Sequence, residues 1–210
     1  MATPAMPQTP DGRETRVSPL KLEVRALEAG DDGSRTVKGY AVVFDSPTNI
    51  GGYFIETIAK GAFTETLRSA DVIALYHHDR ARVIGRSSIG TLRLAEDDRG
   101  LSVEIDLPET TDGQDLYVLI KRGDVSGMSF GFCTTKEEWD ETGDLPKRTV
   151  LQVELYEVTV TAFPAYSDTE IAMRSLESAR AERREHNKVA ASIRISQRRA
   201  RQAQAERNIH

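Results

Sequence analysis

Three separate stretches of the sequence contain side chains that could together carry out nucleophilic catalysis. In the first, Gly123 to Phe132 (GDVSGMSFGF), Ser129 lies between apolar, strand-forming residues shortly after a glycine that can end a helix. A serine hydroxyl becomes a useful nucleophile only when a base accepts its proton and a third group orients that base. The segment His77-His78-Asp79 and the residue Glu157 supply candidates for these two roles.

The elements on either side of Ser129 are predicted from apolar spacing and from capping residues. A helix capped by Thr111 or Asp112 and ended by Gly123 precedes it. A strand follows from Val125 to Cys133, and its alternation puts Ser129 on a face of small residues, opposite the large apolar ones. A substrate backbone could approach such a face.

The histidines follow a continuous apolar run, Val72 to Tyr76, which predicts a buried strand. They therefore lie where a rigid element gives way to a loop, and catalytic side chains are often placed at such positions. A metal site is not expected, because His77, His78 and Asp79 are contiguous and His186 and His210 belong to the C-terminal tail.

The strand predicted from Val150 to Phe163 changes the phase of its alternation. Leu151, Val153 and Leu155 set an apolar face, and the same parity puts Glu157 on it, yet the later apolar residues lie opposite. Either both faces are covered or a bulge intervenes. If both are covered, Glu157 is a carboxylate in the core and needs a partner, for which a histidine is suited.

The remaining pattern predicts a mainly β fold of the α+β type. Residues 1–17 are expected to be disordered because they contain three prolines and little apolar content. Further strands are expected at 20–25, 36–44, 54–58, 91–95 and 101–107, a short helix at 61–68, and loops at 45–53 and 139–144. The strands at 20–25 and 36–44, and those at 91–95 and 101–107, are expected to form hairpins.

Composition points to a soluble, globular chain, with 210 residues, 39% hydrophobic and 29% charged. No apolar run approaches the roughly 18 residues that span a bilayer, and the N-terminus does not have the pattern of a secretory signal, so an intracellular location is expected. The single cysteine, Cys133, is expected to be a structural strand residue. No glycine-rich loop indicates nucleotide binding.

The charge is divided unevenly along the chain. Residues 174–210 contain ten Arg/Lys and four Asp/Glu, a net charge of +6, whereas the preceding part has 18 and 29, a net charge of −11. The tail is rich in helix formers and has no broad apolar stripe, so it is expected to be a helix that is exposed, partly disordered or bound to a partner. The acidic body counts against nucleic acid as that partner.

The order of four segments resembles the prohead proteases of tailed phages, which are related in fold to herpesvirus assemblin. These segments are GAF at 61–63, HHDRARVIGR, KRGDVSGMSFGF and ELYEVTVTAFPAYSDTEI, and the resemblance runs from about Arg35 to Ile171. It implies a closed or partly open antiparallel β-barrel with flanking helices over residues 18–173, followed by the tail at 174–210. It implies a serine endopeptidase, without a cofactor, that cleaves the scaffolding segment of the major capsid protein and often itself, inside the procapsid assembling in the bacterial cytoplasm.

By position, the resemblance makes Ser129 the nucleophile, His78 the base and Glu157 the third member. The residues alone leave a second candidate for each role: Ser126 as nucleophile, His77 as base and Glu154 as third member.

Backbone amides around Ser129 and Phe130 are hypothesised to stabilise the oxyanion. A homo-oligomer is compatible with the sequence. The competing functions are a noncatalytic β-barrel module that organises capsid assembly through the tail, and a nucleic-acid-binding protein.

Overall fold

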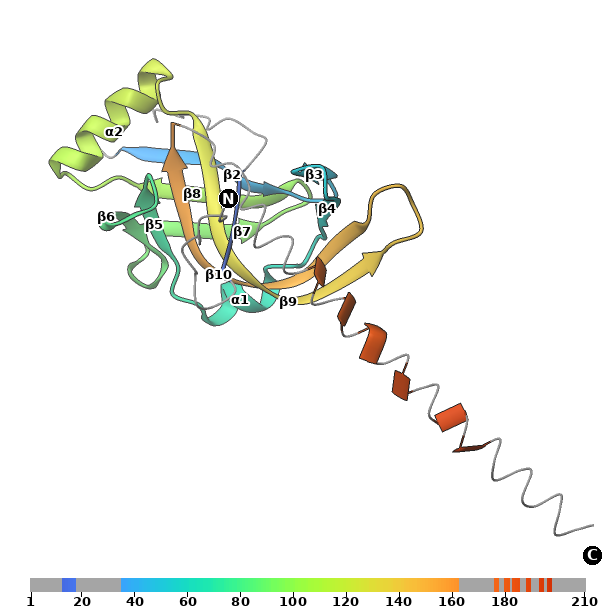
Figure 1. Ribbon diagram of the computed structural model, residues 1–210. Coiled ribbons are helices and arrows are strands. Elements are labelled where there is room, and N and C mark those ends of the chain that lie inside the picture. Colours follow the sequence, from blue (N-terminus) through green and yellow to red (C-terminus); the bar gives the residue numbers. More distant parts are fainter. Residues whose placement is uncertain are drawn as a thin grey trace, which may run out of the picture. The chain divides into compact units, whose positions relative to one another are not determined.

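The computed structural model describes residues 13–17 and 35–162, together with helical positions scattered between 176 and 197 (Figure 1). The chain divides into two compact units, 1–171 and 172–210. The elements of the first unit are β1 (Glu14–Val17), β2 (Thr36–Val43), β3 (Thr48–Ile50), β4 (Phe54–Ile58), α1 (Thr64–Ser69), β5 (Ile73–Tyr76), β6 (Asp79–Arg86), a 3-10 turn (Ser87–Ile89), β7 (Leu92–Glu96), β8 (Gly100–Asp106), α2 (Thr111–Arg122), β9 (Gly127–Asp140) and β10 (Lys147–Thr161). The prediction of a mainly β fold is confirmed.

Two sheets form the body. The larger has the order β1-β9-β10-β4-β3, with β5 paired to another stretch of β10 and β6 paired to β5, and the smaller has the order β2-β8-β7. Strand β10 is antiparallel to β9 but parallel to both β4 and β5. The expectation of an antiparallel sheet is therefore wrong at these two pairs. No ladder among the described strands closes a sheet into a barrel, and the barrel stays a prediction.

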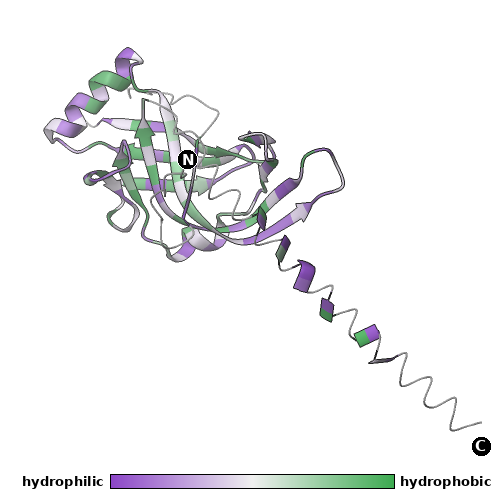
Figure 2. Ribbon diagram, in the orientation of Figure 1, coloured by the Kyte–Doolittle hydropathy of each residue, from purple (hydrophilic) through white to green (hydrophobic). Residues whose placement is uncertain are grey.

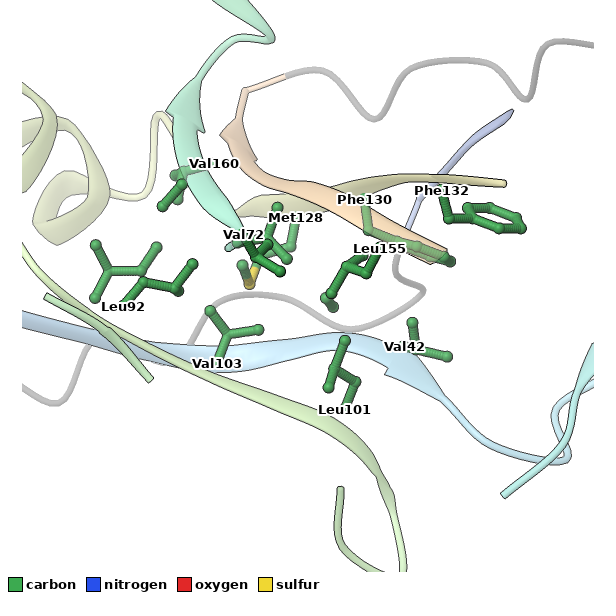
Figure 3. Close-up of a cluster of buried hydrophobic side chains, with 14 of the residues drawn as sticks. Val42, Val72, Leu92, Leu101, Val103, Met128, Phe130, Phe132, Leu155 and Val160 are labelled. Atoms are coloured by element: carbon green, nitrogen blue, oxygen red, sulfur yellow. The ribbon is translucent and has the colours of Figure 1, made fainter. Parts of the chain in front are cut away.

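The hydrophobic core lies between the two sheets, as Figure 3 shows. Large apolar side chains of β9 and β10 face those of the smaller sheet, and all are buried: Met128, Phe130, Leu155 and Val160 on one side, Val42, Leu92, Leu101 and Val103 on the other. Each such side chain stabilises the fold by about 1.5–3 kcal/mol relative to leaving it exposed. The core thus fixes which face of β9 and β10 points away from it.

Most predicted strands are present, including the hairpin of β7 and β8. The predicted strand at 20–25, and with it the hairpin to β2, lies outside the described residues. Two predicted loops are partly strand, because β3 pairs with β4 and β9 continues to Asp140 beside β10. Trp139 packs edge-on against Phe54 with ring centroids 5.0 Å apart, which holds this extension in place. Figure 2 shows that the far end of the β9–β10 hairpin is otherwise hydrophilic.

The helix before Ser129 is present, with a different cap from the one expected. Thr110, in an extended conformation, accepts a hydrogen bond from the backbone N–H of Gly113 on its side chain, so Thr111 is the first helical residue. Gly123 ends α2 with φ 87°, as predicted for a C-terminal glycine. No helix in the part of the chain that the structure describes is long and apolar enough to cross a membrane.

Residues 13–17 correct the expectation of a disordered N-terminal segment. Strand β1 pairs antiparallel with β9, with Val17 opposite Ser129. Two of its polar side chains, Glu14 and Arg16, are almost fully buried. Their ion pairs with strands β4 and β10 hold this segment in place. Its polar composition alone did not predict that it would be ordered.

Candidate active site

A bulge in β10 sets the direction of Glu157. Leu155 lies opposite Phe132 and Glu157 lies opposite Gly131, so Tyr156 is an extra residue in this strand. Beyond the bulge Val158 returns to the core face and Glu157 points to the other face. Of the two arrangements compatible with the sequence, the bulge is correct, and Glu157 is not a core carboxylate; its side chain is 17% exposed.

Ser129 shares this outward face with Glu157. It lies opposite Thr159 in the ladder, and Thr159 and Glu157 are two residues apart on one side of β10. Ser129 is itself 0% exposed. Next along β9 on the same face is Gly131, where a Cβ atom would lie only 2.8 Å from Cγ of Glu157. Because glycine has no side chain, this position leaves the space that Glu157 occupies.

The two histidines form the tip of a tight hairpin. Tyr76 of β5 pairs with Asp79 of β6, so His77 and His78 are the two residues of the turn, with φ of 54° and 59°. Such two-residue turns favour glycine and asparagine, because other side chains are strained at positive φ. Strand β5 is paired to β10, with Tyr76 opposite Val160, and this pairing holds the strained turn beside the strand of Glu157.

His78 connects the other two residues. Its Nε2 lies 2.5 Å from Oγ of Ser129, and its Nδ1 lies 2.7 Å from Oε1 of Glu157. With Glu157 ionised, Nδ1 carries the proton that the carboxylate accepts, which leaves Nε2 free to accept the hydroxyl proton of Ser129. Three elements, the β5–β6 turn, β9 and β10, thus bring together a hydroxyl, an imidazole and a carboxylate in that order.

His77 points to different partners. Its Nδ1 is 3.2 Å from Oγ1 of Thr161, and its ring contacts that of Tyr76 with centroids 4.5 Å apart. Burial, together with the charges of Arg82 and His78, lowers the pKa of His77 below its usual range. The structure therefore brings His78, and not its neighbour, to the serine.

The side-chain hydrogen bonds of His78 run to Ser129 and Glu157, and not to Ser126 or Glu154, the second candidates for nucleophile and third member. Ser126 precedes the start of β9. Glu154 lies on the far side of the bulge, opposite Cys133, and accepts a hydrogen bond of 2.7 Å from the hydroxyl of Tyr156. Among the described residues, no group of three or more His, Cys, Asp or Glu side chains is placed to hold a metal ion.

The backbone amides of Ser129 and Phe130 are poorly placed for an oxyanion. Both residues are paired with β10 on one side and with β1 on the other. Amides in the middle of a sheet lie in its plane, whereas the hydroxyl of Ser129 projects from its face. This geometry disfavours these amides as oxyanion donors.

The chain is similar in sequence to known proteins over most of its length. The sequence pattern of a family described as caudovirus prohead serine proteases matches residues 20–184. This chain belongs to that family. As a prohead serine protease it is 34% identical over 162 residues to the prohead protease of Escherichia phage T5, covering 76% of this chain and 73% of that protein. It is 30% identical over 169 residues to the prohead protease of Enterobacteria phage HK97, covering 77% and 70%. No solved structure matches the chain.

Gly131 is the residue of this prohead serine protease site that sequence reasoning did not single out. The sequence pattern that could have indicated Gly131 is its spacing of two residues from Ser129 in MSFGF, which places both on the same face of the strand. Its role depends on the bulge at Tyr156, because only the shifted register puts Glu157 opposite Gly131. Spacing within one strand does not contain that information.

Proposed function

We propose that the protein is a serine endopeptidase in which Ser129 is the nucleophile, His78 the general base and Glu157 the residue that orients His78. The observation that carries the proposal is the continuous hydrogen-bonded chain from the hydroxyl through the imidazole to the carboxylate, with distances of 2.5 and 2.7 Å. These distances lie in the range required of a nucleophile, base and orienting group. Membership of a family of serine proteases supports the same assignment.

The first half of the reaction is acylation. Nε2 of His78 takes the proton of Ser129 as Oγ bonds to the scissile carbonyl carbon, and the carbonyl oxygen becomes an oxyanion. The protonated imidazole then gives that proton to the amide nitrogen, the C–N bond breaks, and the new N-terminus leaves. An ester between the substrate's acyl group and Ser129 remains.

The second half is hydrolysis of this ester. His78 takes a proton from water, the hydroxide adds to the ester carbonyl, and the proton returns to Oγ of Ser129 as the ester bond breaks. Glu157 stabilises the positively charged imidazole in both halves and fixes its orientation through Nδ1. The hydroxyl of Thr159, 3.5 Å from Oε1 of Glu157, helps to hold the carboxylate.

The substrate that we propose is the scaffolding segment of a major capsid protein, with self-cleavage as a second reaction, inside the procapsid in the host cell. The name prohead protease of the two relatives supports this. A noncatalytic assembly module, the competing function, would not require the three side chains to be hydrogen-bonded in the order that catalysis needs.

The test compares Ser129→Ala with Ser126→Ala, a matched control three residues away. Each purified variant is incubated with the capsid protein encoded beside it, and the products are identified by intact mass. Ser129→Ala should lose cleavage by at least about 10³-fold, as removal of a triad nucleophile does. Ser126→Ala should cleave like the wild type. Fragments that persist in Ser129→Ala would refute the assignment, and loss of cleavage in Ser126→Ala alone would move the nucleophile.

A further inference from the structure

The face of the larger sheet that carries Ser129 opens toward the solvent along β9. Ser129, Gly131 and Cys133 alternate onto this face, and Thr135 follows at a shift in the register of β9 against β10. The first two are buried, Cys133 is half-buried and Thr135 is exposed. The exposure of this face to solvent therefore increases along β9 with distance from Ser129.

An open groove of about 420 Å³ lies at the exposed end, between this face and α1. Helix α1 takes the place of a paired strand beside the middle of β10. The N–H of Val153 donates to the carbonyl of Ala62, and the N–H of Leu155 donates to the hydroxyl of Thr66, each at 3.0 Å. The groove is therefore a fixed part of the fold, built on hydrogen bonds to the strand that carries Glu157.

The wall of the groove joins the catalytic residues directly. Tyr156, the bulge residue, lines the groove and immediately precedes Glu157. Its hydroxyl donates to Glu154 and its ring lies against the guanidinium of Arg13, 4.6 Å from the ring centroid, so the ring is held from two sides. The side chains of His78 and Glu157 are 29% and 17% exposed whereas Ser129 is buried, so solvent reaches the three residues at His78 and Glu157.

The lining of the groove is acidic. Among its described residues are three carboxylates, Glu65, Asp71 and Glu154, and no lysine or arginine. The arginines that pair with the first two, Arg68 and Arg86, do not line it. Glu154 is exposed and accepts its hydrogen bond from an uncharged tyrosine. A ligand with a positive charge complements this lining.

We infer that this groove binds the polypeptide substrate in an extended conformation and accepts a lysine or arginine side chain several residues from the scissile bond. Ser129 and Thr135 are six positions apart in the sequence, which corresponds to about 20 Å, the length of an extended peptide of about six residues. The basic side chain is therefore expected about four to six residues from the bond that is cut, with Glu154 as its main contact. This inference rests on the proposed function, because it extends the substrate from the nucleophile.

The experiment begins with a peptide library made from a digested bacterial proteome, cleaved by the wild-type chain. Lys and Arg should be enriched at a fixed position four to six residues from the cut. Two synthetic peptides, identical except for Lys or Gln at that position, then serve as probes. The wild type should prefer the lysine peptide in kcat/KM by about two- to fivefold, the range that a partly exposed ion pair supplies.

Glu154→Gln should abolish this preference, so that the ratio of kcat/KM for the lysine and glutamine peptides falls to about one. Glu109→Gln, an exposed carboxylate outside the groove, is the matched control and should keep the preference. Labelling of Ser129 with a fluorophosphonate probe measures intact active sites in each variant. Equal labelling excludes misfolding as the reason for a lost preference.

Two failures are distinguishable. Equal cleavage of both peptides by the wild type, or a preference that survives in Glu154→Gln, would overturn the groove as the binding site for a basic residue while leaving the protease intact. Absence of both cleavage and labelling in the wild type, or activity retained in Ser129→Ala, would refute the proposed function and this inference with it.

Discussion

At Gly131 a single added methyl group should disturb catalysis. A Cβ at this position would lie 2.8 Å from Cγ and 3.3 Å from Cδ of Glu157, so the carboxylate must move away from Nδ1 of His78. A displacement of about 1 Å in a catalytic group can cost about 100-fold in rate. We therefore expect Gly131→Ala to lower kcat by about this factor with little change in KM.

The measurement that separates positioning from general damage is a double-mutant cycle. If Gly131→Ala acts through Glu157, it should add almost nothing to the effect of Glu157→Gln on kcat. Gly143→Ala is the control, because its Cβ would meet only the carbonyl of Leu145 at 3.7 Å. Fully additive effects of the two active-site changes would show that Gly131 acts by another route.

Residue type limits the chemistry of single side chains, and it was one basis for choosing the three candidate site residues. Ser129, His78 and Glu157 were expected from residue types, strand positions and family resemblance, and the structure brings them together. The alternation left two arrangements open for Glu157, a core carboxylate on the face of Val153 and Leu155 or a bulge, and the bulge at Tyr156 is the one present. An extra residue becomes visible only when the register with the partner strand is known.

The β5–β6 turn gives a prediction at the scale of one element. His77 and His78 have nearly the same positive φ, so glycine relieves a similar backbone strain at either position. We expect His77→Gly and His78→Gly to have similar melting temperatures. Only His78→Gly should lose activity, by at least about 10³-fold, because only that ring contacts Ser129. The comparison needs kcat/KM and thermal unfolding of both variants. An inactive His77→Gly beside an active His78→Gly would reverse their roles.

The sequence could not predict this turn because it did not predict β6. The strand Asp79–Arg86 begins with charged residues and lacks a clean alternation, and it forms because β5 offers it an edge. Whether His77 or His78 faces the nucleophile follows from the pairing of Tyr76 with Asp79. The apolar run Val72 to Tyr76 did not indicate which histidine faces Ser129. The pairing of β5 with β6 determines it.

At the scale of the whole molecule, β1 pairs with β9, the strand of Ser129, and a buried ion network holds it there. Arg148 is 1% exposed and contacts both Glu14 and Glu56, at 2.7 and 2.8 Å, while Arg16 contacts Glu56 at 2.6 Å. Breaking a buried network by removing one partner is strongly destabilising, because a charge remains unpaired. The partners that stabilise this four-residue polar strand lie far away in the sequence, so its own composition could not predict it. For that reason residues 1–17 were wrongly expected to be disordered throughout.

This network should make stability depend on pH through Glu14. Burial alone would raise the pKa of Glu14, but the hydrogen bond and charge of Arg148, together with the charge of Arg16, lower it from 4.5 to about 2. A carboxyl with a depressed pKa stabilises the fold above its unfolded pKa and loses that contribution as the pH falls through its folded pKa. The shift corresponds to about 3 kcal/mol of unfolding free energy at neutral pH.

We therefore expect Glu14→Gln to lower the free energy of unfolding by about 3 kcal/mol at pH 7, measured by urea denaturation. The difference from the wild type should persist down to about pH 4.5 and shrink as the pH falls toward 2, where the wild-type carboxyl is protonated as well. Glu109→Gln, an exposed carboxylate, should show almost no difference at either pH. A constant difference between Glu14→Gln and the wild type from pH 7 to 2 would mean that Glu14 contributes through packing and not through its charge.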